Sequence, residues 1–353
     1  MSRLWNRRVA GLEPYVPGEQ PKARDLLKLN TNELPYGPSP RALAALRESC
    51  TDTLRLYPDP TSLALRETIG HAYDVTPDRV FVGNGSDEVL AHAFRGLFRD
   101  DAPALFADVT YGFYPVYCGL FDQPFETIPL GEDFRIDVRA YDRPCGGIAI
   151  ANPNANTGIA LPVAELAWLA RARPDSTLIV DEAYVDFGAD SAIRLTRDHD
   201  NVLVVQTLSK SRALAGLRVG YAIGHPDLIE GLTRVKDSFN SYPLDRLAQI
   251  GAAAAIADSA WLAETTGRVI ATREALVRAL AQRGFQVLPS CANFILMRHA
   301  THSAASLQLR LRERDIIVRR LGMPRIADWL RLTIGTDRDS DRLLAALDDI
   351  RVN

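Results

Sequence analysis

The chain has 353 residues and a net charge of −3, with 47% hydrophobic and 24% charged residues. This is ordinary globular composition, with enough length for two hydrophobic cores. The weak negative charge argues against nucleic acid or an anionic membrane as the main partner, and no apolar stretch reaches the length of a membrane span. Four scattered cysteines, Cys50, Cys118, Cys145 and Cys291, have no metal-ligand spacing, so we expect a reducing cytoplasmic setting and no metal site.

The first forty residues, 1–40, are rich in proline and are expected to form an extended arm, because proline disrupts a helix interior. The arm contains Tyr15 in an EPY motif. It also contains Asn32, within the segment LNTNELPYGP at residues 29–38. Shortly after the arm, the motif YPDP places Tyr57 in a rigid turn.

Five short apolar runs follow, and each has the length and composition of a strand buried on both faces. Strands of this kind form parallel sheets with helices on both sides, which predicts an α/β fold. Ligands of such folds bind beyond the carboxyl ends of the strands. The predicted strands span residues 80–82, 104–107, 147–151, 177–180 and 202–205.

The turn after the first of these strands is rich in glycine and leads into a strongly helical run. Free backbone N–H groups and the helix dipole make such a helix start favourable for an anion. Gly85, Ser86 and Asp87 are therefore candidates for holding a phosphate, although Ser86 and Asp87 could equally serve as helix caps.

The turn after the last of these strands contains a lysine, Lys210, surrounded by phosphate-binding side chains. Thr207 and Ser209 precede it and Arg218 follows it. Hydroxyl groups donate hydrogen bonds to phosphate, and a guanidinium presents a fixed fork to its oxygens. A single lysine after a strand is usually a solvated surface residue, but these neighbours favour a phosphate site beside a reactive amine.

The segment SKSRALAGLRVGY, residues 209–221, resembles the Schiff-base lysine segment of fold type I pyridoxal-phosphate (PLP) enzymes, in the branch with the histidinol-phosphate aminotransferases. The segments LNTNELP, NPNANTG and DEAY are similar to motifs of the same family and occur in its order. The resemblance covers nearly the whole chain. It implies a large domain with a mainly parallel seven-stranded sheet between helices, and a smaller α+β domain.

The resemblance also implies roles around the cofactor. Lys210 would carry PLP, and Asp181 would face the pyridine nitrogen and keep it protonated. Tyr111 would stack on the ring, although Val109 replaces a proline of the family pattern beside it. Tyr184 would form a hydrogen bond with the phenolic oxygen of PLP.

An asparagine of the family also contacts that phenolic oxygen, and the NPNANTG segment departs from the family pattern here. Ala155 occupies the position that often carries this asparagine, and Asn156 replaces a proline. Asn154 is favoured for the role by its chemistry, with Asn156 as the alternative.

The resemblance further assigns residues that bind substrate. Tyr15 and Asn32 come from the arm, and Arg331 would clamp a carboxylate bidentately. Arg319 or its neighbour Arg320 would bind a substrate phosphate. For one arginine alone, a surface ion pair is the more common explanation.

The same resemblance implies a homodimer with two domains in each subunit. Tyr57 would reach across the interface to the partner's cofactor phosphate. The large PLP-binding domain is expected to span residues 41–242 and the small domain residues 243–353. We expect the small domain to contain helices at 252–283 and 304–314 and strands near 286–288, 294–297, 316–318 and 329–334.

The implied reaction is a PLP-dependent transamination between an amino donor and a 2-oxo acid. By resemblance, L-histidinol phosphate and 2-oxoglutarate give imidazole acetol phosphate and glutamate, in histidine biosynthesis. An aromatic amino acid aminotransferase is the nearest alternative, and phosphate recognition by Tyr15 and Arg319 would separate the two. A lyase similar to threonine-phosphate decarboxylase would share the cofactor residues. A non-catalytic PLP-binding protein is disfavoured because the lysine, the aspartate and the arginine are all present.

Overall fold

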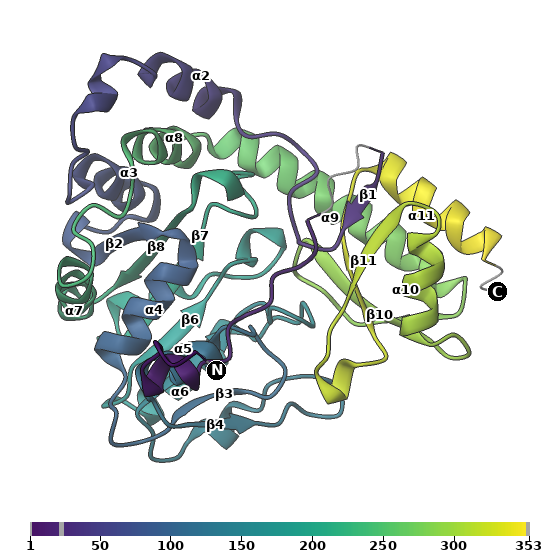
Figure 1. The fold of residues 1–353 in the computed structure, drawn as a ribbon, viewed down its shortest axis with the longest axis horizontal. Helices are drawn as coiled ribbons and strands as arrows, with labels where there is room; N and C mark the ends of the chain where they lie inside the picture. Colours follow the sequence, from purple (N-terminus) through teal and green to yellow (C-terminus); the bar gives the residue numbers. More distant parts are fainter. Residues whose placement is uncertain (1, 21–24, 351–353) are drawn as a thin grey trace.

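The structure is a computed structural model that describes residues 2–20 and 25–350. Figure 1 shows a larger body around one sheet and a smaller body around a second sheet, with the long helix α9 (Ser259–Ala281) running between them. None of the helices in the described part of the chain is long and apolar enough to cross a membrane.

The larger body is built on a seven-stranded sheet with the order β2-β8-β7-β6-β5-β3-β4. Strands β7, β6, β5, β3 and β4 run parallel, whereas β8 is antiparallel to both of its neighbours. This confirms the predicted α/β class with a mainly parallel sheet. The strands are β2 (Val80–Asn84), β3 (Ala104–Ala107), β4 (Phe125–Ile128), β5 (Gly147–Ala151), β6 (Leu178–Asp181), β7 (Val202–Thr207) and β8 (Val219–Gly224).

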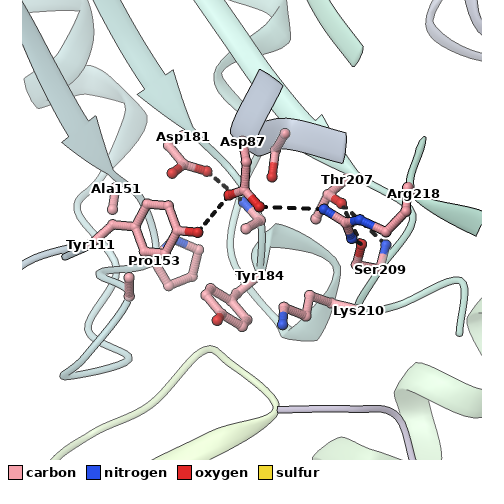
Figure 2. A pocket seen from close by; sticks show the side chains of 13 residues that line it. Asp87, Tyr111, Ala151, Pro153, Asp181, Tyr184, Thr207, Ser209, Lys210 and Arg218 are labelled. Carbon is pink, nitrogen blue, oxygen red and sulfur yellow. Dashed lines mark hydrogen bonds and ion pairs between the residues drawn. The ribbon is translucent and has the colours of Figure 1, made fainter. Parts of the chain in front are cut away.

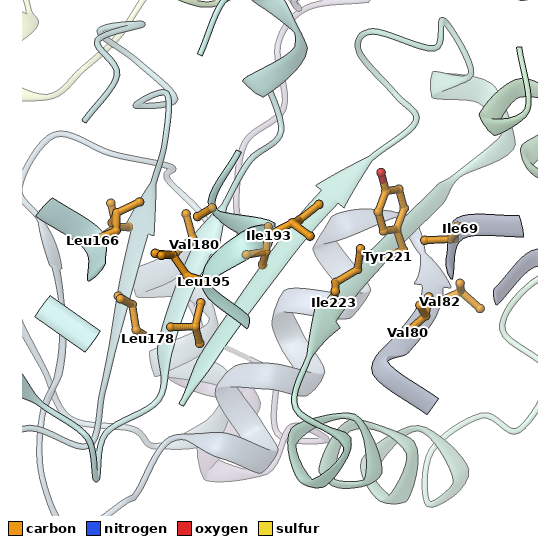
Figure 3. Packing of buried hydrophobic residues seen from close by; sticks show 14 of the residues in the cluster. Ile69, Val80, Val82, Leu166, Leu178, Val180, Ile193, Leu195, Tyr221 and Ile223 are labelled. Atoms are coloured by element: carbon orange, nitrogen blue, oxygen red, sulfur yellow. The ribbon is translucent and has the colours of Figure 1, made fainter. Parts of the chain in front are cut away.

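Both faces of this sheet are buried, which explains why its strands are apolar at successive positions. Along β6, Leu178 and Val180 pack into one hydrophobic cluster, whereas Ile179 between them packs into the cluster on the opposite face. Figure 3 shows the first cluster, where side chains of several strands lie together with Ile69 and Leu166 from the covering helices. Alternating side chains therefore hold helices on both sides of the sheet.

Eleven α-helices are assigned in the described residues. They are α1 (Arg7–Ala10), α2 (Pro40–Ser49), α3 (Leu63–Tyr73), α4 (Gly85–Leu97), α5 (Tyr114–Phe121), α6 (Val163–Ala172), α7 (Pro226–Asp237), α8 (Arg246–Ile256), α9 (Ser259–Ala281), α10 (Ala304–Arg312) and α11 (Asp337–Asp349).

The smaller body contains a five-stranded sheet with the order β1-β11-β12-β10-β9. Its first strand, β1 (Leu27–Leu29), comes from the N-terminal arm and pairs parallel to β11. The arm is thus mostly extended, as predicted, but it is tied into this sheet and also contains the short helix α1. The other strands are β9 (Phe285–Val287), β10 (Phe294–His299), β11 (Ile316–Arg320) and β12 (Leu330–Thr333).

One expected helix of the smaller domain is two helices. The segment predicted to be helical at residues 252–283 is divided between α8 and α9, with Asp258 as the N-cap of α9. The buried residues of α8 pack in the cluster of the larger sheet, whereas Val269 and Leu276 of α9 pack in that of the smaller sheet. We therefore propose a domain division near residue 258, later than the expected division after residue 242.

Candidate active site

A pocket lies at the carboxyl ends of β5, β6 and β7, beside the first turn of α4, where the strand pattern placed a ligand (Figure 2). Its lining includes the sequence-predicted residues Ser86, Asp87, Tyr111, Asp181, Tyr184, Thr207, Ser209, Lys210 and Arg218. Residues from segments far apart in the chain are therefore brought together at one sheet edge.

One end of this pocket is suited to an anion. Helix α4 begins at Gly85, whose φ of +80° favours glycine, and a Cβ there would lie 2.3 Å from Nη2 of Arg218. Arg218 donates to Oγ of Ser209 over 3.2 Å, and the Thr207 hydroxyl donates to the same oxygen over 3.1 Å. A guanidinium, two hydroxyls and the N-terminus of a helix thus meet at one point.

Asp87 and Tyr111 connect this anion site to the middle of the pocket. Oδ2 of Asp87 lies 3.3 Å from Nη2 of Arg218, and Oδ1 accepts a 2.6 Å hydrogen bond from the Tyr111 hydroxyl (Figure 2). Burial, together with the nearby Asp87 carboxylate, raises the pKa of Tyr111 well above its usual value. Tyr111 is therefore a neutral aromatic ring on the wall of the pocket.

Asp181 lies at the opposite end of the pocket, at the last position of β6, and its side chain is buried. Its Oδ2 accepts from the Tyr114 hydroxyl over 3.0 Å, and its Oδ1 accepts from the Ala183 N–H over 3.3 Å. Burial raises the pKa of Asp181 to about 6, against the opposing effect of these hydrogen bonds. Sequence reasoning missed Tyr114, because nothing in the sequence distinguishes it from the other tyrosines of that segment.

Glu182, the next residue, takes no part in the pocket. It is buried and accepts hydrogen bonds from the Ser191 hydroxyl, the Ala192 N–H and the Gln206 side-chain amide. Burial raises the pKa of Glu182 to about 7. The two neighbouring acids thus have different roles, since one faces the pocket and the other holds the loop after β6.

Lys210 and Tyr184 form the centre of the site. Nζ of Lys210 lies 5.8 Å from the centroid of the Tyr184 ring and donates to the carbonyl oxygen of Thr31 over 3.4 Å. Within the described residues, no carboxylate lies within 4 Å of this amine. The amine is therefore not held in an ion pair.

A second pocket continues from the first on the side of the arm and the smaller sheet. The two pockets share Tyr111, Ala155, Tyr184 and Lys210. Of the residues predicted to bind substrate, the second pocket is lined by Tyr15, Asn32, Arg319 and Arg331. The Tyr15 ring stacks on Phe113 at a centroid distance of 4.4 Å and lies 6.4 Å from the ring of Tyr111.

Two guanidiniums of the second pocket have only neutral partners. Arg331 on β12 donates to the Ala155 carbonyl over 3.2 Å and to Oδ1 of Asn156 over 3.3 Å, and burial lowers its pKa. Arg319 on β11 donates to the carbonyl of Val16 over 3.3 Å. In the part of the chain that the structure describes, neither guanidinium has a carboxylate within 4 Å.

The residues of two pairs of alternatives lie in different places. Arg319 lines the second pocket, whereas Arg320 is exposed and lines only a groove beside α10. Asn154 lines neither pocket: its amide donates to the carbonyl of Val109 over 2.8 Å, and its Oδ1 accepts from the N–H groups of Asn156 and Thr157 over 3.0 Å. The Asn154 side chain therefore holds its loop in this structure, and its assignment to a ligand stays a prediction.

Tyr57 lies away from both pockets of its own chain. Its side chain is 80% exposed, and its ring stacks on Tyr242 at 4.8 Å. Asn32 does line the second pocket, but its buried amide is bonded to Tyr184 and Thr333, which no sequence pattern indicated.

Comparison with known proteins identifies the family of the chain. The family model described as aminotransferase class I and II matches residues 24–347. The histidinol-phosphate aminotransferase 2 of Gluconobacter oxydans is 68% identical over 99% of both chains, and the histidinol-phosphate aminotransferase of Gluconacetobacter diazotrophicus is 62% identical over 99% of this chain and 98% of its own.

The fold agrees as well. A crystal structure of histidinol-phosphate aminotransferase from Sinorhizobium meliloti in complex with pyridoxal-5'-phosphate superposes with a TM-score of 0.88, covering 99% of this chain and 98% of that one at 24% identity. At that identity the likeness establishes the fold, and the identity of the full-length relatives establishes the family. The chain therefore belongs to the class I and II aminotransferases and, among them, to the histidinol-phosphate aminotransferase family.

Proposed function

We propose that the protein is a PLP-dependent transaminase that converts L-histidinol phosphate and 2-oxoglutarate to imidazole acetol phosphate and L-glutamate. One observation carries this proposal: Lys210 lies between an anion site and buried carboxylate on one side, and two guanidiniums without carboxylate partners on the other. The names of the full-length relatives support the same reaction.

The first pocket offers groups suited to the charges of PLP at its two ends. The phosphate would be held by Ser86, Thr207, Ser209 and Arg218, where Gly85 leaves room for the guanidinium. Asp181, at the other end, would be the partner of the pyridine nitrogen. Its raised pKa is that of a carboxyl without a cationic partner, and a protonated ring nitrogen beside it would lower that pKa again.

When bound, PLP supplies a ring that accepts the negative charge left on the donor carbon after its proton is removed. Asp181 would keep the ring nitrogen protonated, and the hydrogen bond from Tyr114 would keep Asp181 ionised. Tyr111 would cover one face of the ring, and Tyr184 would donate a hydrogen bond to the phenolic oxygen.

Lys210 would attach the cofactor covalently and, once displaced by the donor amine, would move the proton. An amine held at this place is within reach of the donor carbon and can act as the general base for its proton. Its position beside the Tyr184 ring and the Thr31 carbonyl would direct Nζ toward the space shared by the two pockets.

The second pocket would bind both substrates in turn. The donor carries a phosphate and the acceptor carries two carboxylates, so both present anions to Arg331 and Arg319. Since these guanidiniums have only neutral oxygen partners, a substrate anion would form an ion pair with them and would not have to displace a protein carboxylate. Tyr15 would contribute a further hydrogen bond to the donor phosphate.

The active form is proposed to be a cytoplasmic homodimer, in which Tyr57 meets the partner's cofactor phosphate. Exposed apolar side chains near Tyr57 support this arrangement, because a surface of this kind is typical of an interface. They include Leu54 and Leu56, which are 50% and 49% exposed, and Tyr242, on which the Tyr57 ring stacks.

The proposal is tested by measuring glutamate formed from 2-oxoglutarate with three donors: L-histidinol phosphate, L-histidinol and L-phenylalanine. We expect L-histidinol phosphate to have the highest kcat/KM by at least about tenfold, because the phosphate adds charged hydrogen bonds. Preference for phenylalanine would instead indicate an aromatic aminotransferase. Release of carbon dioxide from threonine phosphate without glutamate formation would indicate the lyase.

A further inference from the structure

The contact between Asn32 and Tyr184 has no place in the roles assigned so far. Position 155, where an asparagine would face the phenolic oxygen of PLP, is an alanine on the pocket wall, and the Asn154 amide is bonded within its loop. The alternative, Asn156, lines only the second pocket, where its amide donates to the Thr110 carbonyl and its Oδ1 accepts from Arg331. Tyr184 is thus the remaining group proposed for that oxygen that lines the first pocket, and the direction of its proton becomes important.

Asn32 makes a buried hydrogen bond to this tyrosine. Its Nδ2 donates to the Tyr184 hydroxyl oxygen over 3.0 Å, and both side chains are more than nine-tenths buried. Asn32 has a φ of +56°, a left-handed conformation that asparagine adopts more readily than other non-glycine residues. Asparagine is therefore suited to this backbone position.

The orientation of this amide is fixed by the smaller sheet. The Thr333 hydroxyl accepts the Asn32 backbone N–H over 2.9 Å and donates to Oδ1 of Asn32 over 3.0 Å. The Asn293 amide donates to the Asn32 carbonyl over 2.9 Å. Because Oδ1 is the acceptor for Thr333, Nδ2 is the atom left facing Tyr184.

This arrangement determines what Tyr184 can do with its own proton. A hydroxyl that accepts from Asn32 must direct its hydrogen elsewhere, and among the described residues it has no acceptor. The ring lines both pockets, so the free direction is toward the space that PLP would fill.

We propose that Asn32 is a positioning residue that holds the Tyr184 hydroxyl with its proton toward the phenolic oxygen of bound PLP. It acts through Tyr184 and compensates for the missing asparagine at position 155. This inference rests on the proposed function, because it requires PLP in the first pocket.

The measurable consequence is the pH titration of the visible absorption band of the Lys210–PLP linkage. A hydrogen bond to the phenolic oxygen stabilises its negative charge and so favours loss of the proton from the linkage. Replacing Asn32 by glycine keeps the left-handed backbone but removes the amide. We expect the titration midpoint of Asn32→Gly to rise by about 0.5 to 1 pH unit, the equivalent of one ordinary hydrogen bond.

A double-mutant cycle tests whether this effect passes through the tyrosine. Tyr184→Phe should raise the midpoint at least as much as Asn32→Gly, and the double variant should titrate like Tyr184→Phe alone, because the two groups act as one unit. Asn30→Ala is the matched control, since the Asn30 amide bonds the Glu19 carbonyl within the arm, and it should titrate like the wild type.

The outcomes separate this inference from the proposed function. A wild type that forms no visible band with PLP would overturn both. A wild-type midpoint in Asn32→Gly, or additive shifts in the double variant, would overturn only the role of Asn32. If Asn32→Gly does not fold, Thr333→Val removes the hydroxyl that orients the amide and should shift the midpoint in the same direction by a smaller amount.

Discussion

The two halves of the site differ in how their charges are balanced. In the half formed by the larger sheet, Arg218 pairs with Asp87, and Asp181 accepts from Tyr114. In the half formed by the arm and the smaller sheet, Arg319 and Arg331 contact only neutral oxygens.

This difference corresponds to the ligands proposed for each half. A cofactor that stays bound can be held by groups that are ordered before it arrives, on strands buried in one core. Substrates bind and leave in every turnover. For them, a guanidinium without a carboxylate partner is suitable, because it forms its ion pair only when the substrate anion is bound. The comparison therefore predicts that substitutions in the first half affect cofactor and chemistry, and that those in the second half affect substrate affinity.

The largest effect is expected at the centre that both halves share. Lys210→Ala removes both the cofactor attachment and the group that moves the proton, so turnover should fall by about 10³-fold or more. Glutamate formation measures the turnover. The midpoint of thermal unfolding is measured as well and should stay near that of the wild type, which shows that the variant is folded. Lys210→Arg keeps the positive charge but should be equally inactive. Wild-type turnover in either variant would contradict the assignment of Lys210.

The next effect is expected in the substrate half. Arg331→Lys keeps a charge but loses the guanidinium fork, and we expect kcat/KM for both substrates to fall by about 10²-fold. The PLP band should be unchanged, because Arg331 does not line the first pocket. Loss of the PLP band in Arg331→Lys would instead place Arg331 in the cofactor half.

A smaller and more selective effect is expected for Arg319. Arg319→Ala should raise the KM for L-histidinol phosphate about tenfold and leave that for L-histidinol almost unchanged, because only the former carries a phosphate. The exposed neighbour Arg320 supplies the control, and steady-state kinetics of Arg320→Ala should resemble the wild type. Equal effects at the two positions would argue against a phosphate site at Arg319.

The smallest effect concerns the free energy of unfolding and comes from Glu182, which is buried beside the cofactor half but does not line its pocket. Glu182 has a folded-state pKa of about 7, raised from 4.5 by burial, so the folded protein keeps a proton that the unfolded chain has lost. Stability of the cofactor-free protein should therefore fall as pH rises from about 4.5 to about 7. Asp181, with a pKa raised to about 6, should act in the same direction.

Glu182→Gln removes this titration and should reduce the loss of unfolding free energy between about pH 5 and about pH 8 by ~1–3 kcal/mol. Urea denaturation at the two pH values gives the comparison. Glu264→Gln, a change at an exposed residue, should behave as the wild type. An unchanged pH dependence in Glu182→Gln would show that Glu182 does not titrate in this range.

Much of the larger body could be predicted from sequence because local patterns determine it. Apolar runs became β3 and β5 with the expected bounds, and the polar residues after the strands meet at one edge. The smaller body was harder, since the helix expected at residues 252–283 is interrupted before Asp258, whose carboxylate caps α9.

The site residues that sequence reasoning missed depend on long-range contacts. Tyr114 is significant only because β6 brings Asp181 to its hydroxyl, and Asn32 only because β12 brings Thr333 to its amide. Asn154 was chosen by its chemistry, but local backbone groups compete for a short amide and occupy it. Motifs in the sequence identify candidate residues for a site, whereas the tertiary contacts decide which of their polar atoms remain free to bind a ligand.

The most direct test of the account is the visible spectrum of the PLP-loaded protein before and after addition of L-histidinol phosphate, with no oxo acid present. We expect the yellow band to disappear with L-histidinol phosphate and to return on addition of 2-oxoglutarate. A band that is unaffected by L-histidinol phosphate but disappears with phenylalanine or tyrosine would contradict the proposed division between a cofactor half and a phosphate-binding substrate half.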